Sequence, residues 1–253
     1  MADRTDYILE KLDQDGFLNV NDLASELGVS SATIRRDFMA LEEDGKLRRV
    51  AGGAIPVPEN SLATLESDQD VEHKIYLNSA AKHKVCEMAA ELVADGDCVF
   101  IDGGTTTASL FNLLQDRRIT IVTNNILLVA AIELPVTASF ILIGGTYMPE
   151  HALTYSSTAY TQIQSYNFNH CFIACAGVDV GRNYSYCTET ETRDFKLLAL
   201  QQSMHKHLLI DSSKFGKVGF CNLERLDRFD TVFVDKRAAD AAEYPANFRF
   251  FEA

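Results

Sequence analysis

The sequence contains no long apolar run. Its longest hydrophobic stretches have the length of a β-strand, so no segment predicts a membrane span. The first residues also lack the apolar core of a signal peptide, so no export is expected. What the chain does contain, 253 residues of which 47% are apolar, is enough for one small domain and one full-sized domain. We therefore expect a soluble, globular protein without a membrane partner.

The six cysteines never form a CxxC pair and are scattered along the chain, mostly among apolar residues. This pattern favours reduced thiols and a cytoplasmic location over a disulfide framework. His170, Cys171 and Cys175 lie close together in the sequence, but the surrounding HCFIACA is typical of a buried strand rather than of a zinc site. Neither a metal nor another cofactor is expected.

Residues 17–54 have the pattern of two short helices followed by a β-hairpin. The apolar residues that share one face are Leu23, Ala24 and Leu27 in the first helix and Ile34, Phe38 and Leu41 in the second. Gly28 ends the first helix, and Ser30 or Ser31 can cap the second by accepting a hydrogen bond from a free backbone N–H. A further helix at residues 3–14 would complete a three-helix core.

The outward face of the second helix carries small, hydroxyl and guanidinium groups, which suits a helix that reads the major groove. Residues 46–50 then alternate as a short strand and turn at Gly52-Gly53, which predicts a basic wing against the phosphates. The predicted DNA-binding residues are Ser30, Ser31, Ala32, Thr33, Arg35, Arg36, Arg48 and Arg49. A helical hairpin that exposes a solvated charged face and binds no nucleic acid is the alternative reading.

Positive charge is scarce for a DNA-binding protein. The chain has 23 Lys and Arg against 36 Asp and Glu, a formal net charge of −13, and residues 1–55 hold seven positive against eleven acidic side chains. Five of those seven positive residues lie between residues 35 and 49, and salt screens charges beyond about 8 Å, so the local cluster matters most. We expect few phosphate contacts per head. This favours a homodimer or a higher homo-oligomer on a double-stranded DNA operator.

Residues 56–78 are polar and contain Pro56 and Pro58, as is typical of a connecting arm. We therefore predict a winged helix-turn-helix domain at residues 1–57, a linker at 58–78 and an α/β effector-sensing domain at 79–253.

The rest of the chain alternates strand-length apolar runs with helix-length segments, which predicts an open, mostly parallel sheet covered on both faces. The expected strands are 98–102, 119–123, 139–144, 170–176, 207–211 and 231–235, and the expected helices are 82–95, 106–115, 125–134, 155–165 and 190–206. The predicted fold class is therefore α/β, an N-terminal winged helix-turn-helix plus this effector domain.

Small and polar residues follow most of these strands, where ligands bind in open α/β sheets. Residues 102–107, DGGTTT, lead from a strand into a helix, so free N–H groups and hydroxyls converge as a phosphate requires. The predicted effector-binding residues are Asp102, Gly103, Gly104, Thr105, Thr106, Thr123, Asn124, Gly144, Gly145, Asp179, Glu191 and Lys214. Singly, each also fits ordinary turn chemistry or a solvated surface residue.

The head resembles the N-terminal winged helix of the DeoR family of bacterial transcription regulators. The residues that carry this resemblance are Leu23, Ala24, Gly28-Val29-Ser30, Thr33-Ile34-Arg35-Arg36-Asp37, Leu41-Glu42, Gly45, Leu47, Arg49 and Gly52-Gly53-Ala54. The later motifs DGGTTT, TNN, Gly144-Gly145, AGVD, Glu191 with Lys196, and DSSKFG resemble the effector domain of the same family. That domain is similar in fold to ribose-phosphate isomerases and CoA transferases. One departure leaves the ligand unnamed: many members carry a glycine shortly after the GG strand, where this chain has HALTYSSTAY.

The resemblance implies a regulator, most often a repressor of a carbohydrate-catabolism operon, that is released when a phosphorylated sugar effector binds. It implies that Gly104, Thr105, Thr106 and Lys214 hold phosphate and that Asp102, Asn124 and Glu191 meet sugar hydroxyls. The alternative is an enzyme of the sugar-phosphate isomerase type with a DNA-binding head. Asp102, Asp179 and Glu191 are its candidate bases, although no diagnostic catalytic motif accompanies them.

Overall fold

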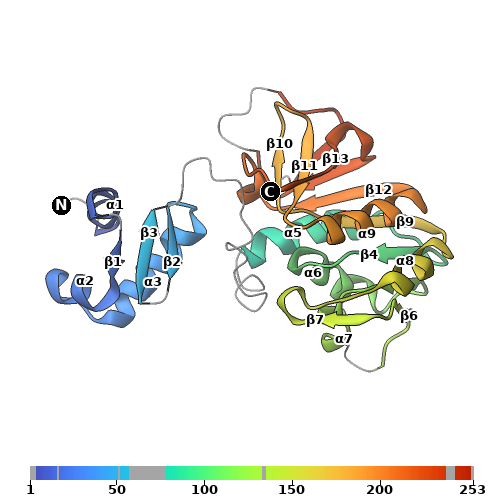
Figure 1. Ribbon diagram of the computed structural model, residues 1–253, viewed down its shortest axis with the longest axis horizontal. Coiled ribbons are helices and arrows are strands. Elements are labelled where there is room, and N and C mark those ends of the chain that lie inside the picture. The colour runs from blue at the N-terminus through green and yellow to red at the C-terminus, as the bar shows by residue number, and fades with distance from the viewer. Residues whose placement is uncertain are drawn as a thin grey trace. The chain divides into compact units, whose positions relative to one another are not determined.

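The computed structural model describes residues 4–15, 17–50, 52–56, 78–132, 135–237 and 243–251, and the chain divides into two compact units, Met1–Ser61 and Leu62–Ala253 (Figure 1). The predicted linker at 58–78 lies outside the described residues apart from Asn78. The predicted fold class is confirmed: a helix-turn-helix head precedes an α/β domain with a parallel sheet.

The head is a small three-helix domain with a β-hairpin. Its elements are α1 (Arg4–Asp15), β1 (Leu18–Asn19), α2 (Val20–Leu27), α3 (Ser31–Glu43), β2 (Leu47–Val50) and β3 (Gly53–Pro56). The strands form an antiparallel sheet in the order β1-β3-β2. Gly28 ends α2 with φ +64°, a left-handed conformation in which a side chain would be strained. The predicted apolar stripes meet in one core, where Leu23, Ile34, Phe38 and Leu41 are buried.

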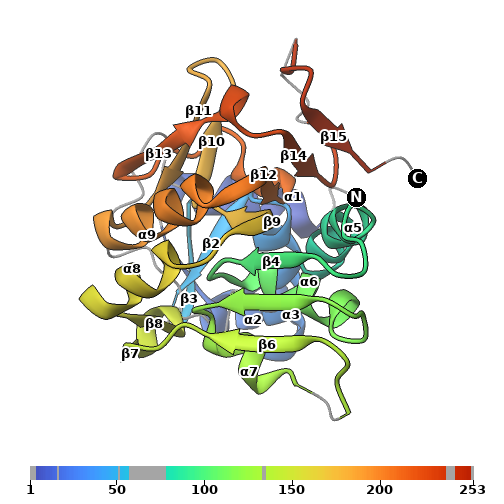
Figure 2. The same ribbon diagram turned by 90° about the vertical axis from the view of Figure 1, so that its right-hand side faces the viewer.

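The second unit is built on a seven-stranded parallel sheet. In the order β15-β14-β12-β9-β4-β5-β6 its strands are β15 (Phe248–Phe250), β14 (Thr231–Val234), β12 (Ser203–Ile210), β9 (Phe168–Ala174), β4 (Cys98–Ile101), β5 (Thr120–Thr123) and β6 (Ser139–Leu142), and Figure 2 shows this order. The chain runs from β4 through β5 to β6 at one edge and returns to β9 on the other side of β4. The topological switch point of the sheet therefore lies between β4 and β9.

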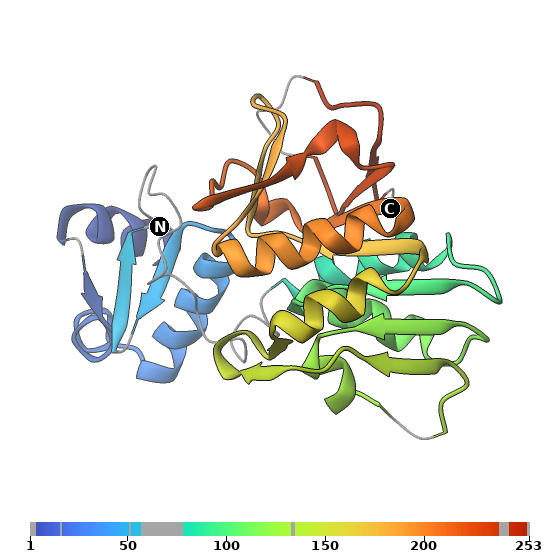
Figure 3. The same ribbon diagram turned by 45° about the vertical axis from the view of Figure 1, so that its right-hand side comes forward.

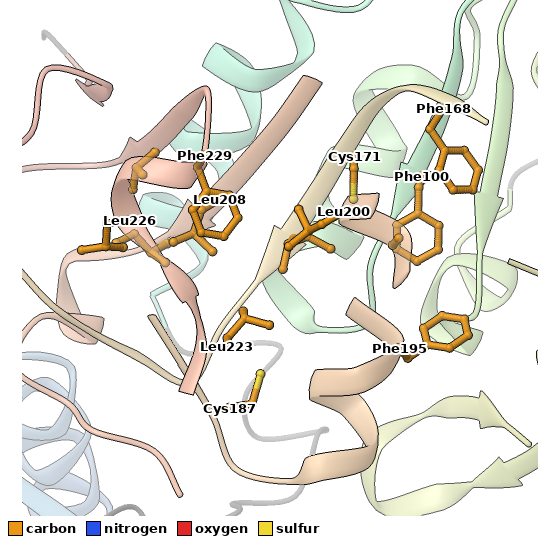
Figure 4. Close-up of a cluster of buried hydrophobic side chains, with 14 of the residues drawn as sticks. Phe100, Phe168, Cys171, Cys187, Phe195, Leu200, Leu208, Leu223, Leu226 and Phe229 are labelled. Atoms are coloured by element: carbon orange, nitrogen blue, oxygen red, sulfur yellow. The ribbon is translucent and has the colours of Figure 1, made fainter. Parts of the chain in front are cut away.

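Helices cover both faces of this sheet because successive residues of each strand point to opposite sides. Phe100 packs against Phe168 and Phe195 on the face covered by α8 (Ser157–Gln164) and α9 (Thr190–Gln201), the yellow and orange helices of Figure 3. Figure 4 shows these three rings together in that core. Val99 and Ile101 pack on the other face, under α5 (Ser79–Ala90), α6 (Thr105–Leu114) and α7 (Ile126–Ala130).

Several short elements were not predicted. A hairpin of β7 (Thr146–Met148) and β8 (Leu153–Tyr155) follows β6, with the turn η2 (Pro149–His151) between its strands. A second small sheet, β10 (Gly177–Asp179), β11 (Tyr184–Cys187) and β13 (Cys221–Arg225), rises from the main one (Figure 1). The turns η3 (Ser212–Lys214) and η4 (Leu226–Arg228), the strand β1 of the head and the edge strand β15 of the main sheet were not predicted either.

Three predicted helices had wrong boundaries. The helix expected at 82–95 is α5, which begins at Ser79 and stops at Ala90. The helix expected at 190–206 stops at Gln201, because residues 203–206 pair with β9 as the first part of β12. The helix expected at 125–134 stops at Ala130. Within the described ranges, no helix combines the length and the apolar character needed to span a bilayer.

Candidate functional site

The exposed face of α3 is the candidate DNA-reading surface. Ala32, Arg35, Arg36 and Met39 are exposed at positions i, i+3, i+4 and i+7, on the side opposite the buried stripe. Neither Arg35 nor Arg36 forms a recorded ion pair with a described residue. Two guanidinium groups on one helical face can take a guanine edge and a phosphate, so the predicted outward face is present.

The hydroxyl residues at the start of α3 are instead engaged within the head. Ser30 caps the helix: its Oγ accepts a hydrogen bond from the Thr33 N–H at 3.1 Å and lies 2.8 Å from the Thr33 Oγ1. The Ser31 Oγ donates to the Asn21 side chain at 3.0 Å, which ties α3 to α2. These groups fix the turn between the two helices, so base contacts by the serines compete with internal bonds.

The two wing arginines differ in environment. The Arg49 guanidinium lies 2.5 Å from the Glu42 carboxylate, which also accepts the Arg49 backbone N–H at 2.7 Å, and the Glu42 side chain is only 6% exposed. Arg49 therefore holds β2 against α3. Arg48 has no recorded ion pair with a described residue. Arg4 pairs with Asp37 of α3, because its guanidinium donates to both Asp37 carboxylate oxygens at 2.6 and 2.8 Å.

A buried ion pair occupies the switch point of the large sheet. The Asp102 carboxylate, directly after β4, accepts hydrogen bonds from the Lys196 ammonium and from the Ala174 N–H at the end of β9. The ammonium also donates to the Ala174 carbonyl at 3.2 Å. Burial raises the pKa of Asp102 and would lower that of Lys196, but contact with the carboxylate keeps the pKa of Lys196 above its usual value.

Above this pair, α6 begins without a side-chain cap. Its N-cap residue Gly104 has φ +136°, which only glycine adopts readily, and the Thr107 hydroxyl donates to the Asp102 carbonyl at 2.7 Å. The first N–H groups of a helix have no intrahelical acceptor and carry partial positive charge. The Lys82 ammonium, from α5, donates to the Thr105 Oγ1 at 2.8 Å at this same helix end.

The loop after β12 brings a further cation to the edge of the sheet where the parallel strands end, which we call the rim. Asp211 is buried and accepts hydrogen bonds from the Ser213 N–H at 3.0 Å and from the Asn78 side chain at 3.1 Å. Burial acts to raise the pKa of Asp211, but Lys214, the Ser213 bonds and Lys82 together lower it below its usual value. Asp211 is therefore a carboxylate that lies near both lysines.

Two of the predicted effector-binding glycines have a packing role. A Cβ at Gly103 would lie 2.3 Å from the Leu153 side chain, and one at Gly145 would lie 2.9 Å from the Tyr155 backbone. Both glycines therefore allow strand β8 to pack closely against the chain. Gly144 differs, since a Cβ there would meet nothing within 4 Å. The close backbone approach expected at Gly145 is therefore made by the hairpin.

Other predicted effector residues lie below the surface or away from the rim. Thr123 and Thr106 are buried, and the Thr123 hydroxyl donates to the Ile101 carbonyl at 2.6 Å. Asn124 is also buried, and its Oδ1 has no hydrogen-bond partner among the described groups. Asp179 ends β10 and accepts the Arg182 N–H at 2.9 Å within the turn to β11, in the small sheet. This position makes Asp179 a turn residue.

The acidic residue that faces inward at the start of α9 is Glu189 rather than Glu191. Glu191 is exposed. The Glu189 carboxylate is 17% exposed, lies 3.4 Å from the His151 Nε2 and accepts a hydrogen bond from the Thr192 hydroxyl at 3.3 Å. The sequence could not separate these two acids, because they lie two residues apart at the start of the same helix.

Three residues of the candidate site were not among the predicted effector-binding residues: Lys82, Lys196 and Glu189. Lys196 had entered only as one of the residues that carry the family resemblance. Both lysines left a signal in the sequence. Lys82 precedes Val85, Cys86 and Ala89 at i+3, i+4 and i+7, and Lys196 precedes Ala199 and Leu200 at i+3 and i+4, so each lysine sits on the apolar face of its own helix. A charged residue within a buried stripe indicates a paired or functional ion.

A cavity of about 280 Å³ lies elsewhere, between α9, β13 and η4, with Leu200, Lys206, Arg228 and Phe229 among its walls. No predicted effector residue lines it. Since the strand ends and the buried lysines gather at the switch point, the chemistry favours the rim there over this cavity. The described residues include no group of His, Cys, Asp or Glu side chains arranged to hold a metal ion.

Comparison with known proteins covers both units. Residues 4–59 match the DeoR-like helix-turn-helix domain, and residues 77–236 match the DeoR C-terminal sensor domain. The lactose phosphotransferase system repressor of Lactococcus lactis subsp. lactis is 32% identical over 92% of this chain and 91% of its own length. The L-fucose operon activator of Haemophilus influenzae (strain ATCC 51907 / DSM 11121 / KW20 / Rd) is 27% identical over 94% of this chain and 93% of its own length.

Several solved structures have only a partial likeness to this chain, as one example shows. Ribose 5-phosphate isomerase A of Methanocaldococcus jannaschii covers 55% of this chain and 56% of its own, with 15% identity and a TM-score of 0.40. That likeness is too low to carry an argument about activity. The family matches, in contrast, extend over both the head and the α/β unit and leave only short segments outside. The chain belongs to the DeoR family of helix-turn-helix transcription regulators.

Proposed function

We propose that this chain represses a carbohydrate-catabolism operon and that a phosphorylated sugar relieves the repression. Two features of one chain carry the proposal. One is the arginine-bearing face of α3, and the other is the switch point of the separate α/β domain, where Lys82 donates to the start of α6 and Lys196 pairs with Asp102. The relatives support the choice of sugar metabolism, because their names refer to a lactose phosphotransferase system and an L-fucose operon. One is a repressor and the other an activator, so the direction of regulation is part of the proposal.

In the head, we assign direct reading to Ala32, Arg35 and Arg36 and phosphate contact to Arg48. Ser30, Ser31, Thr33 and Arg49 then act mainly by holding α3 and the wing in place, since each has a partner inside the head. A recognition helix needs this rigidity, because base edges are read by side chains held in a fixed register. Two such heads on a palindromic operator would make the functional unit at least a homodimer.

In the effector domain, the phosphate is assigned to Gly104, Thr105 and the Lys214 ammonium. Free N–H groups at a helix start and a nearby lysine are the donors that a phosphate monoester requires. Asn124 is a candidate for a sugar hydroxyl, because its unsatisfied Oδ1 needs a donor. Asp102 supports the site from below. Its carboxylate already accepts hydrogen bonds from the Lys196 ammonium and from the Ala174 N–H, and Asp102 is only 2% exposed.

The switch requires that the effector bind the DNA-incompetent arrangement more tightly than the competent one. Only that difference in affinity can move the equilibrium, and couplings of about 1–3 kcal/mol are typical.

An isomerase-type activity is the competing function. It needs a general base beside the phosphate. Of the candidate bases, Asp102 is paired with Lys196, Asp179 belongs to a turn, and Glu191 is exposed at the start of α9. These environments favour sensing over catalysis.

A thermal-shift screen of the full chain against pentose, hexose and hexosamine phosphates tests the proposal. A phosphate present at 100 times its dissociation constant should stabilise the protein by about 2.7 kcal/mol, whereas the parent sugar should have little effect. The same mixtures are then analysed for product. Conversion of any sugar phosphate would contradict the assignment as a sensor.

A further inference from the structure

Two cysteines face each other across neighbouring strands of the small sheet. Cys187, at the end of β11, and Cys221, at the start of β13, are direct register partners in an antiparallel pair. Side chains that oppose one another in this way lie on the same face of a sheet, with Cβ atoms about 4.5–5.5 Å apart. A disulfide needs about 3.5–4.5 Å between the Cβ atoms, so a small approach of the two strands brings the sulfurs to bonding distance.

The two thiols differ in their surroundings. Burial is the main reason that the pKa of Cys187 is raised to about 12, although Lys196 acts against it. Cys221 begins the edge strand of the small sheet and follows Phe220, which is 67% exposed. A thiol reacts with a peroxide as its thiolate, and only where the peroxide can reach it. These positions assign the first attack to Cys221 and the second step to Cys187.

A cation of α9 lies beside both thiols. The hydrogen bond to Asp194 contributes most to raising the pKa of the Arg193 guanidinium, and Cys221 and Cys187 add to that increase. The guanidinium therefore lies within electrostatic reach of both sulfurs. A neighbouring arginine stabilises a thiolate, so Arg193 favours the reactive form of either cysteine.

Cys175 is a third thiol that interacts electrostatically with Cys187 and is its competing partner. The Cys175 Sγ donates to the Gly177 carbonyl at 3.3 Å, and Cys175 lies between β9 and β10, outside the paired strands. It has no cysteine opposite it in a described strand pair. The register therefore favours Cys221 as the partner of Cys187.

We propose that Cys187 and Cys221 form a reversible disulfide when the protein meets a hydroperoxide. The Cys221 thiolate attacks one peroxide oxygen, the O–O bond breaks, and Cys221 becomes a sulfenic acid, while the other oxygen leaves and takes up the proton that Cys221 had released. The Cys187 thiol then attacks the sulfenic sulfur, the S–S bond forms, and the hydroxyl leaves as water with the Cys187 proton. With hydrogen peroxide, the thiols lose two electrons and the peroxide is reduced to two waters. The inference does not depend on which effector the protein binds.

The bond closes a segment that contributes to the switch point. Residues 188–220, between the two cysteines, include Lys196, which pairs with Asp102, and Lys214, in the loop after β12. A cross-link that closes a loop of this length restricts the unfolded chain and so stabilises the folded state. Oxidation should therefore raise the melting temperature of the effector domain by about 5–10 °C.

The test uses the full chain, first reduced and then freed of reductant. It is treated with hydrogen peroxide, and its peptides are mapped by mass spectrometry without reduction. We expect the peptide that contains Cys187 to be joined to the peptide that contains Cys221, with loss of two of the six free thiols. The melting temperature should rise and should return to its starting value when a small dithiol is added.

Two variants assign the bond. Cys221→Ala should abolish both the cross-link and the rise in melting temperature. Cys175→Ala is the matched control, because it removes the competing thiol near Cys187, and it should keep both effects.

Three results would overturn the inference: six free thiols after treatment, a cross-link between Cys175 and Cys187, or oxidation of single cysteines without a cross-link. A bond between two chains, seen as a dimer on a non-reducing gel, would contradict it as well. Should Cys221→Ala not fold, the peptide map of the wild type decides the matter, because it requires no variant.

Discussion

Arginines and lysines of this chain are either exposed on the surface or paired with an acid inside the fold, and their contacts decide which. Arg36 projects from α3 without a recorded ion pair to a described residue, whereas Arg49 is held by the Glu42 carboxylate at 2.5 Å. The lysines differ in the same way: Lys196 pairs with Asp102 at the switch point of the sheet, while Lys84 lies on the surface. The residue type therefore predicts a capability, and the contact decides how it is used.

Arg36→Ala should weaken operator binding by about 1–3 kcal/mol and leave both folding and phosphate binding unchanged. Arg49→Ala is the comparison. It should lower the melting temperature of the head, because it removes the guanidinium that contacts the mostly buried Glu42 carboxylate. Fluorescence anisotropy on a duplex that the wild type selects from a random pool measures the first effect. Equal loss of DNA and phosphate affinity in Arg36→Ala would refute its assignment to the groove.

His207 should make the effector domain sensitive to acid. Its ring is 3% exposed, stacks on Phe172 at 5.0 Å and lies 3.0 Å from the His170 Nδ1. Burial first, and then His170 and His205, lower the pKa of His207 from 6.5 to about 4, although Asp230 acts against them. As the pH falls, the unfolded chain takes up this proton before the folded one. The stability gained by a neutral His207 is thus complete above about pH 6.5 and is lost as the pH falls towards 4.

The pH effect is measured by urea unfolding at pH 7.5 and pH 5. His207→Phe should lose less stability between these values than the wild type. The neutral His207 ring contributes up to about 3 kcal/mol to the free energy of unfolding over the full pH range. Met204→Ala is the control, because Met204 is an exposed, non-titrating residue of β12 and its replacement should leave the slope unchanged. A wild-type slope in His207→Phe would show that other groups carry the acid sensitivity.

Among the elements, the hairpin of β7 and β8 does most to shape the effector rim. Strand β8 packs against Gly103 and Gly145, and its Thr154 N–H donates to the Asn124 carbonyl at 2.9 Å. The hairpin therefore lies over the ends of β4 and β5. It also places His151, in the turn η2, beside the Glu189 carboxylate of α9.

The adjacent glycines of this hairpin provide a matched pair of substitutions. Gly145→Ala should destabilise the effector domain by about 1–3 kcal/mol, because a Cβ would overlap the Tyr155 backbone at 2.9 Å and backbone cannot move away cheaply. Gly144→Ala meets open space and should change stability little. Thermal unfolding of the two variants distinguishes them. If both alanines are tolerated but only one abolishes phosphate binding, the glycine pair contacts the ligand instead of the hairpin.

The regular elements were predictable from sequence because their patterns are local. Apolar runs such as 98–102 and the stripe Ile34, Phe38 and Leu41 located the strands and the recognition helix within a few residues. The hairpin strand β8 and the small sheet of β10, β11 and β13 were missed, because these short strands contain polar residues and lack the continuous apolar run that marked β4. The partners of Asp102 and Thr105 were missed for another reason. Lys196 lies 94 residues from Asp102, and Lys82 lies 23 residues from Thr105, so only tertiary packing joins them.

For the whole molecule, the acidic balance is the main constraint on DNA binding. The formal net charge is −13, and the head itself has more acids than bases. Internal pairing leaves this net charge unchanged, although it neutralises two acids of α3: Arg4 pairs with Asp37 and Arg49 pairs with Glu42. Few cations remain for phosphates, so operator affinity should depend weakly on salt for a DNA-binding protein and should rely on more than one head.

Lys214→Ala should separate the two activities of the chain. The variant keeps the head intact, so it should bind the selected duplex with wild-type affinity, but it should no longer be released by a sugar phosphate. Lys236→Ala is the control, because Lys236 is an exposed lysine after β14. Normal release of Lys214→Ala would show that this lysine is an ordinary surface residue.

The account as a whole depends on the effector domain weakening the hold of the head on DNA. The most direct measurement is the dissociation constant of the wild-type chain for its selected duplex, with and without each sugar phosphate of the panel. At least one phosphate should raise that constant by about 5- to 150-fold, and its unphosphorylated sugar should not. A duplex affinity that stays the same in the presence of a sugar phosphate shown to bind would contradict the account.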